Sequence, residues 1–231
     1  MIANPPNAVA GLCVIFVSLH IALALIPAGA ARQIWRYFEL SPKRALRALE
    51  AGEFFKVVRT LIGHIFFHVN LAHLLINLAA VLVLGAIVHR EMAARAQHRK
   101  SDATAAFFGF FLISGMMAGA VFILSVPDSY QPMIGASGAA AGLAGACAWL
   151  FVTRTADGKP SPNALRNLLV LFLVSAALIA ASYFLDTSKV SLKLFGSVSA
   201  WQAHVGGYVF GLVFYPLFER LAGAAHEPAQ R

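Results

Sequence analysis

Long apolar runs alternate with short polar segments along the whole chain. The six runs cover residues 9–30, 71–88, 104–126, 134–152, 167–185 and 199–218, and none of them contains Asp, Glu, Lys or Arg. A helix needs about 20 mainly apolar residues to cross a hydrocarbon core roughly 30 Å thick. The pattern therefore predicts an all-α integral membrane protein with six transmembrane helices.

The first apolar run, residues 9–30, also has the position of a secretory signal peptide. No Lys or Arg precedes it, and five further apolar runs follow it. A signal peptide normally begins with a basic segment, so we expect a retained first helix.

The segment between the first two runs, residues 31–70, is too rich in apolar side chains to be a simple tether. Residues 33–40 and 42–61 mix aromatic and aliphatic side chains with Arg and Lys in an amphipathic pattern. Such a pattern is typical of helices that lie in the headgroup region. We expect a partly membrane-embedded helical hairpin here, and the alternative is a solvated basic loop. With no appended soluble domain and a short tail from residue 222, the chain is predicted to be one domain, residues 1–231.

Composition supports the membrane assignment and excludes other classes. Hydrophobic residues make up 59% of the chain and charged residues 12%, with a mean hydropathy of +0.73, whereas a soluble domain has about 25% charged residues. Two Cys cannot form a disulfide framework. The net charge of +8 comes from Lys and Arg confined to segments between the apolar runs. They are placed to face anionic headgroups, and no nucleic-acid partner is predicted.

The distribution of basic residues predicts the orientation in the membrane. Segments on the same side as the N-terminus hold nine Lys and Arg, and the other side also holds nine, seven of them in the first loop. Without that long loop the count is nine against two. The positive-inside rule then places both termini in the cytoplasm.

Polar side chains within uncharged spans are costly, so each one is a candidate functional group. His73 and Asn77 are spaced i and i+4 and share one face of the second span. Ser137 lies at the start of the fourth span, where unsatisfied N–H groups and the helix dipole favour a developing anion. His204 lies just over a turn into the sixth span. The arrangement suits a Ser nucleophile, a His base and a pair of oxyanion donors.

The predicted topology places these groups at one depth. Spans two, four and six all begin on the non-cytoplasmic side, and His73, Ser137 and His204 fall within their first two turns. Glycines near Ser137 and His204, namely Gly135, Gly138, Gly207 and Gly211, are spaced for close helix packing. Such glycines alone indicate no more than close helix packing. Packing does not explain why several polar groups share one depth.

These residues resemble the motifs of the rhomboid intramembrane serine proteases. The matching segments are His73-xxx-Asn77, Gly135-Ala136-Ser137-Gly138 and Ala203-His204-xx-Gly207-xxx-Gly211. The resemblance implies a six-helix rhomboid-like bundle of the basic prokaryotic type. It implies Ser137 as nucleophile and His204 as general base in a dyad, with His73 and Asn77 stabilising the oxyanion. One departure is Ala141, which stands where some members carry an aromatic residue that packs on the catalytic His.

By this resemblance we expect a serine endopeptidase that cleaves single-span membrane proteins near the non-cytoplasmic face, in a bacterial inner membrane. The lipid bilayer is then its environment, and no metal or cofactor is expected. Two alternatives stay open: a catalytically inactive rhomboid-like protein that binds membrane clients, and a small-solute transporter. The sequence has no feature that specifies an oligomeric state.

Overall fold

The computed structural model describes residues 4–96, 100–155, 159–171, 173 and 200–224. This part of the chain is helical and contains no β-strand, only two isolated bridges. The helices are α1 (Asn7–Leu25), α2 (Ala28–Phe38), α3 (Pro42–Glu50), α4 (Phe54–Gly63), η1 (His64–Phe66), α5 (Leu71–Arg95), α6 (Lys100–Ser125), α7 (Ser137–Thr153) and α10 (Trp201–Ala224).

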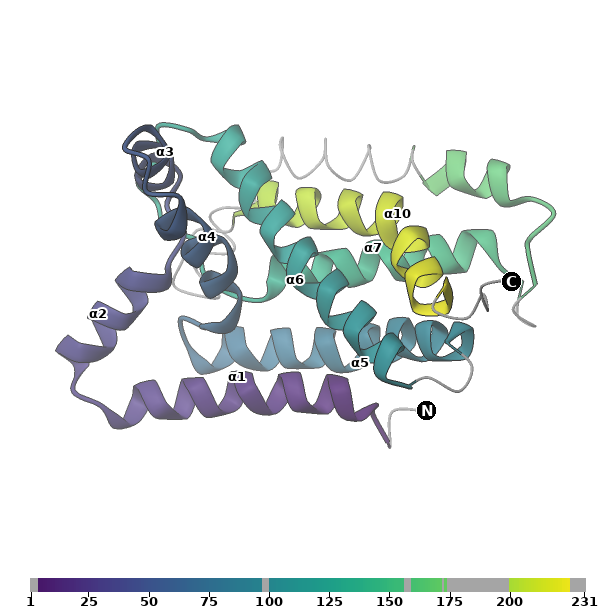
Figure 1. The fold of residues 1–231 in the computed structure, drawn as a ribbon, viewed down its shortest axis with the longest axis horizontal. Helices are drawn as coiled ribbons and strands as arrows, with labels where there is room; N and C mark the ends of the chain where they lie inside the picture. The colour runs from purple at the N-terminus through teal and green to yellow at the C-terminus, as the bar shows by residue number, and fades with distance from the viewer. Residues whose placement is uncertain (1–3, 97–99, 156–158, 172, 174–199, 225–231) are drawn as a thin grey trace, which may run out of the picture.

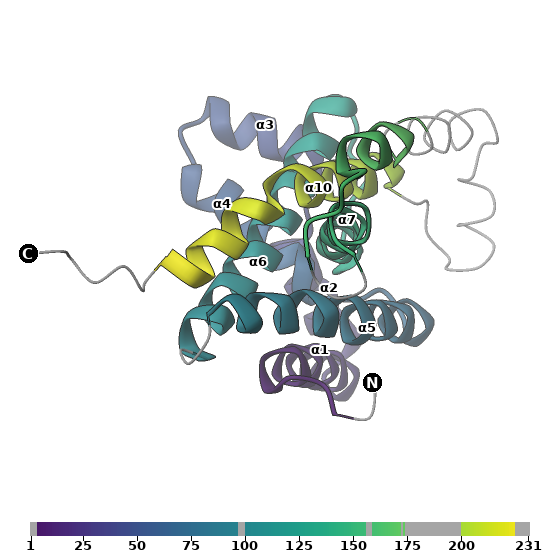
Figure 2. The ribbon, with the colours of Figure 1, turned by 90° about the vertical axis from the view of Figure 1, so that its right-hand side faces the viewer.

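Long helices form a bundle, and the short helices α2, α3 and α4 gather at one end of it (Figure 1). α5, α7 and α10 all begin at that end, as the predicted topology requires. α7 lies at the centre of the bundle, where it contacts α10, α6 and α5 (Figure 2). The central position follows from its composition, because a helix made largely of Gly and Ala lets neighbouring helices approach closely.

Among the described residues, three helices are long and apolar enough to cross a membrane: Asn7–Leu25, Leu71–Arg95 and Ser101–Ser125. The apolar helix α7 is shorter, at 17 residues. The fifth predicted span, residues 167–185, lies outside the described residues apart from its first few positions. The described part thus supports an all-helical membrane protein.

Two predicted boundaries differ from the observed ones because of backbone chemistry. The first run does not form a single helix over residues 9–30: α1 ends at Leu25, and α2 begins after Pro27. Proline lacks an N–H and fixes φ, so it separates the helices. The fourth run, residues 134–152, forms a helix only from Ser137, because Gly135 has a φ of 120° that no right-handed helix contains.

The first loop is helical as predicted, but it is not a two-helix hairpin. Residues 42–61 divide into α3 and α4 at Gly52, whose φ of 75° favours glycine. Apolar side chains remain exposed on this surface, including Phe54 and Phe55 at 63% and 93%. Exposure of large apolar groups is expected where a helix lies against lipid.

α7 and α10 touch through their backbones at glycines. A Cβ placed at Gly207 would overlap the Gly138 carbonyl oxygen, and one at Gly211 would overlap that of Gly142. A Cβ at Gly145 would overlap the Tyr208 carbonyl oxygen. No side chain can occupy these positions without moving the helices apart, so glycine is required for this separation.

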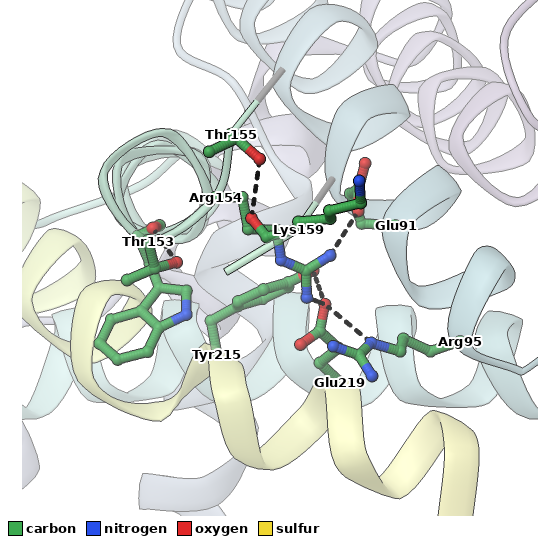
Figure 3. Close-up of polar contacts among 9 residues, drawn as sticks. Glu91, Arg95, Thr153, Arg154, Thr155, Lys159, Tyr215 and Glu219 are labelled. Carbon is green, nitrogen blue, oxygen red and sulfur yellow. Dashed lines mark hydrogen bonds and ion pairs between the residues drawn. The ribbon is translucent and has the colours of Figure 1, made fainter. Parts of the chain in front are cut away.

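A cluster of charges joins the opposite ends of the same helices and has the buried Glu219 carboxylate at its centre (Figure 3). Arg154, directly after α7, donates to Glu219 of α10 and, at 2.9 Å, to Glu91 of α5. The Tyr215 hydroxyl donates to Glu219 at 3.3 Å, and Arg95 lies 3.9 Å from the same carboxylate oxygen. The Glu219 side chain is only 9% exposed. No sequence pattern predicts this cluster, because each of its charged residues is an ordinary span-flanking charge in the sequence.

We expect Arg154→Met to destabilise the protein strongly, because it leaves Glu219 buried without its main partner. Breaking a buried ion pair by removing one partner costs about 3–5 kcal/mol. The matched control is Lys43→Met, since Lys43 pairs at 3.2 Å with Asp128, whose side chain is 93% exposed. Exposed pairs contribute about 0–1 kcal/mol. Unfolding of both variants in detergent, followed by circular dichroism, measures the difference, and equal effects would contradict the structural role given to Arg154.

We expect Gly207→Ala to lower the free energy of unfolding by about 1–3 kcal/mol, because the added methyl group overpacks the contact with α7. Gly223→Ala is the control in the same helix: its Cβ would lie 3.5 Å from the Arg95 carbonyl oxygen, an ordinary contact. Thermal unfolding of the two variants side by side tests this. The proposed helix contact is wrong if Gly207→Ala melts at the same temperature as Gly223→Ala.

Candidate active site

Ser137 and His204 meet between the first turns of α7 and α10. Ser137 is the first residue of α7, and His204 lies three residues after the start of α10. The distance from His204 Nε2 to Ser137 Oγ is 2.8 Å. This is hydrogen-bonding distance, and it is the geometry a nucleophile needs to pass its proton to a base. The glycine contacts between Gly138 and Gly207 bring the two helices close at this level.

The start of α5 supplies two further polar side chains. The Asn70 side chain caps the helix by accepting a hydrogen bond from the His73 N–H at 2.9 Å. One turn further on, Asn77 Nδ2 donates to the His73 carbonyl oxygen at 2.8 Å, and this side chain is buried. That bond uses one N–H of the amide and fixes its orientation, so the other N–H has a defined direction.

The first loop holds the segment that leads into α7. Leu40 and Met133 form an isolated antiparallel bridge, with N–H to oxygen distances of 3.1 and 2.7 Å. The Gly135 N–H donates to the His64 carbonyl oxygen at 2.7 Å. These bonds set the path of the backbone immediately before Ser137. The first loop therefore positions the candidate nucleophile although it lies far from it in sequence.

Gly135 was predicted to support helix packing, but its surroundings point to another role. It precedes α7, and a Cβ at this position would lie 2.6 Å from Cε1 of the His73 ring. Its φ of 120° is also in the region that favours glycine. Gly135 thus allows both the turn into α7 and the close approach of the His73 ring.

His68 also lies beside the candidate site, although it is outside the predicted spans and its spacing to His73 carries no chemical role by itself. Its ring is buried, stands edge-on to His73 at 5.4 Å between centroids, and accepts a long hydrogen bond of 3.5 Å from the Ala136 N–H. Burial, together with the neighbouring His73 and His20, lowers the pKa of His68 to about 3. His68 is therefore neutral and can act as an acceptor behind the nucleophile.

One cavity of about 380 Å³ contains the candidate groups. Ser137, His204, His73 and Asn77 all line it, together with Gly135 and Gly138. The remaining described lining residues are mainly apolar, and they come from α5, α7, α10 and the segments that directly precede these helices. Of the predicted site residues, Gly207 and Gly211 do not line the cavity but lie at the α7–α10 contact behind it. Within the described part of the chain, no group of three or more His, Cys, Asp or Glu side chains could hold a metal ion.

The described part of the chain is an all-helical membrane protein. It holds a Ser–His pair in a cavity near one end of its helix bundle. The family model described as Rhomboid domain matches residues 56–220, well over half of the 231 residues. The chain therefore belongs to the rhomboid family, whose members are generally intramembrane serine proteases. A search of curated proteins found no match.

We expect Gly135→Ala to reduce both stability and the reactivity of Ser137, because the new methyl group strains the backbone and displaces the His73 ring. Gly52→Ala is the matched control: Gly52 also has a positive φ, of 75°, but its Cβ would meet nothing within 4 Å. It should lower stability only, by about 1–2 kcal/mol. Labelling of Ser137 with a fluorophosphonate probe and thermal unfolding separate the two effects. Equal labelling of both variants would show that the His73 contact does not matter for the site.

We expect the protein to lose stability in mild acid, because His64 and His68 of the first loop are buried in their neutral form. Burial lowers the pKa of His64 to about 4, and that of His68 to about 3, from 6.5. Below pH 6.5 the unfolded chain binds protons that the folded protein does not, so their contribution is present above pH 6.5 and falls as pH decreases. Each adds a slope to the free energy of unfolding that rises from about 0.7 kcal/mol per pH unit at pH 6.5 to about 1.4 near pH 5. Between pH 5 and 6.5, the free energy of unfolding measured with denaturant should depend less steeply on pH in His64→Gln and in His68→Gln, by about 1 kcal/mol per pH unit on average. An unchanged pH dependence would contradict their burial as neutral groups.

Proposed function

We propose that this protein is an intramembrane serine endopeptidase that cleaves single-span membrane proteins through a Ser137–His204 dyad. The observation that carries the proposal is the 2.8 Å separation of His204 Nε2 and Ser137 Oγ inside a cavity. A serine hydroxyl is a weak nucleophile unless an adjacent base accepts its proton, and this geometry provides that base.

Stabilisation of the oxyanion comes from α5 and from the start of α7 in this mechanism. His73 and Asn77 line the same cavity as Ser137. The first intrahelical bond of α7 runs from the Ala140 N–H to the Ala136 carbonyl, at 2.8 Å. The N–H groups of the first turn therefore have no acceptor within the helix, and they lie at its positive end. Donors fixed in place before reaction stabilise a developing negative charge without reorganisation.

The reaction then proceeds in two transfers. Ser137 Oγ attacks the scissile carbonyl carbon while its proton moves to His204 Nε2, which gives a tetrahedral oxyanion. Its collapse breaks the C–N bond, the proton passes from His204 to the leaving amine, and an acyl-enzyme remains. Water attacks the acyl carbon and gives its proton to His204, and release of Ser137 with that proton regenerates the dyad.

The substrate in this proposal is itself a transmembrane helix. A helix commits its carbonyl groups to internal hydrogen bonds, so the substrate must unwind at the cleavage site before Ser137 can reach one. Water must also reach the cavity, which favours a site near the non-cytoplasmic membrane surface. We place the domain over residues 1–231 in a six-helix topology, with residues 167–185 as the fifth span, both termini cytoplasmic and the protein in a bacterial inner membrane.

The two alternatives have less support. An inactive client-binding relative has no need for a serine at hydrogen-bonding distance from a histidine, and here both are present. A solute transporter would use a polar cavity, but it would not require the hydroxyl at a helix start beside a base.

The deciding experiment combines labelling and cleavage. We expect a fluorophosphonate probe to modify the wild-type protein in detergent and to modify neither Ser137→Ala nor His204→Ala above background. Both variants should fail to cleave a model single-span substrate while their unfolding temperatures stay close to that of the wild type, since both side chains face a cavity. Ser114→Ala is the control, because Ser114 is a buried serine of α6 outside the cavity. Proteolysis by purified Ser137→Ala would overturn the proposal.

A further inference from the structure

The first loop carries seven Lys and Arg on the side of the membrane that is predicted to be non-cytoplasmic. Loops on that side are normally poor in basic residues, so these side chains need another explanation. Five of the seven have a partner within the protein. The partners are Asp128 for Lys43, Glu39 for Arg44, Glu53 for Lys56, the Tyr37 carbonyl oxygen and ring for Arg59, and the Tyr130 ring for Arg47. The side chains of Arg32 and Arg36 remain, and both are exposed without an ion pair, hydrogen bond or ring contact to any described residue.

Both arginines belong to α2, an amphipathic helix in which no residue is buried. Arg32 and Arg36 are spaced i and i+4, so they share one face of the helix. The opposite face carries Ile34, Trp35 and Phe38, which are half-buried. α2 follows directly after α1 and runs obliquely to it across the end of the bundle (Figure 1). A helix with this polarity and position is suited to lie in the headgroup region, with its apolar face toward the acyl chains.

The two unpaired charges favour one kind of headgroup. A guanidinium group donates to phosphate oxygens through a planar fork of N–H groups. The Cα atoms of Arg32 and Arg36 are about 6 Å apart along the helix axis, so both side chains can reach the same headgroup. No Asp or Glu of α2 neutralises them. A zwitterionic headgroup brings an ammonium group of its own, which weakens its attraction to two cations, whereas an anionic headgroup has no such group.

We propose that Arg32 and Arg36 form a binding site for the headgroup of an anionic phospholipid, whose acyl chains lie against the apolar face of α2. An acidic protein segment would meet the two charges but would not cover the apolar face, so a lipid is the occupant that fits both faces. The inference is independent of the proposed peptidase activity, because this surface lies outside the cavity that contains Ser137 and His204.

Trp35 is a reporter beside the proposed site, because it adjoins Arg36 and lies on the apolar face. The chain has three Trp, so Trp149→Phe with Trp201→Phe leaves Trp35 as the single source of Trp fluorescence. This protein is reconstituted in bilayers of phosphatidylcholine and phosphatidylglycerol, in which one or the other lipid carries brominated acyl chains that quench a neighbouring Trp. We expect phosphatidylglycerol to bind beside Trp35 at least about 5-fold more tightly than phosphatidylcholine, because each arginine near an anionic surface contributes about that factor.

In this background, Arg32→Gln combined with Arg36→Gln should bring the preference to about 1, because the charges that select the lipid are gone. The unfolding temperature in detergent should stay unchanged, since neither side chain has a partner among the described residues. The matched control is Lys43→Gln combined with Lys56→Gln, which removes the same charge from the same loop, but from side chains already paired with carboxylates. It should keep most of the preference for phosphatidylglycerol.

Equal binding of the two lipids to the protein with both arginines would overturn the proposal. So would an equal loss of preference in the two double variants, because it would show that the total charge of the loop, and not this pair, selects the lipid. Poly-glutamate is added to bilayers of phosphatidylcholine alone as a further test. If it alters Trp35 fluorescence only when Arg32 and Arg36 are present, while phosphatidylglycerol is not preferred, the surface binds an acidic protein segment and the lipid site is wrong.

Discussion

The backbone contact between α7 and α10 is the constraint on which the rest of the structure depends. A Cβ at Gly207 or Gly211 would overlap the carbonyl oxygen of Gly138 or Gly142, so α10 has no room for a side chain at these two positions. Apolar side chains gain little by leaving lipid for another apolar surface, so helices in a membrane associate through close packing and not through a hydrophobic driving force. Glycine permits that packing, and the same approach brings Ser137 Oγ within 2.8 Å of His204 Nε2. The same contact between α7 and α10 therefore stabilises the bundle and sets the distance between the candidate nucleophile and its base.

Two other interactions hold this helix pair at its ends. At the site end, the first loop fixes the backbone before Ser137 through the bridge from Leu40 to Met133 and the bond from Gly135 to the His64 carbonyl. At the opposite end, Arg154 and Glu219 form a buried ion pair (Figure 3). Buried charge is costly unless it is paired, so this cluster tolerates few arrangements of the three helix ends. The centre of the bundle is left to small apolar contacts.

The polarity of the helices also explains where a reaction could occur. Charged side chains are excluded from the predicted spans, and the polar groups His73, Asn77, Ser137 and His204 converge on one cavity. Each of these side chains alone would be energetically unfavourable in an apolar environment. Together they hydrogen-bond or face a shared space near one end of the bundle. Small residues, Ala141 among them, widen that space.

Hydropathy and spacing predicted the helical membrane class and selected His73, Asn77, Ser137 and His204 as candidate site residues, because hydrophobic periodicity and the cost of a polar group in a span are local properties of the chain. The tertiary structure decided the rest. It showed that Gly135 makes room for the His73 ring, that His68 accepts a bond from the Ala136 N–H, and that Arg154 pairs with Glu219. Each of these depends on segments far apart in sequence, and no local pattern encodes their distance. A glycine or a flanking arginine looks the same in sequence whether its neighbour is lipid, water or another helix.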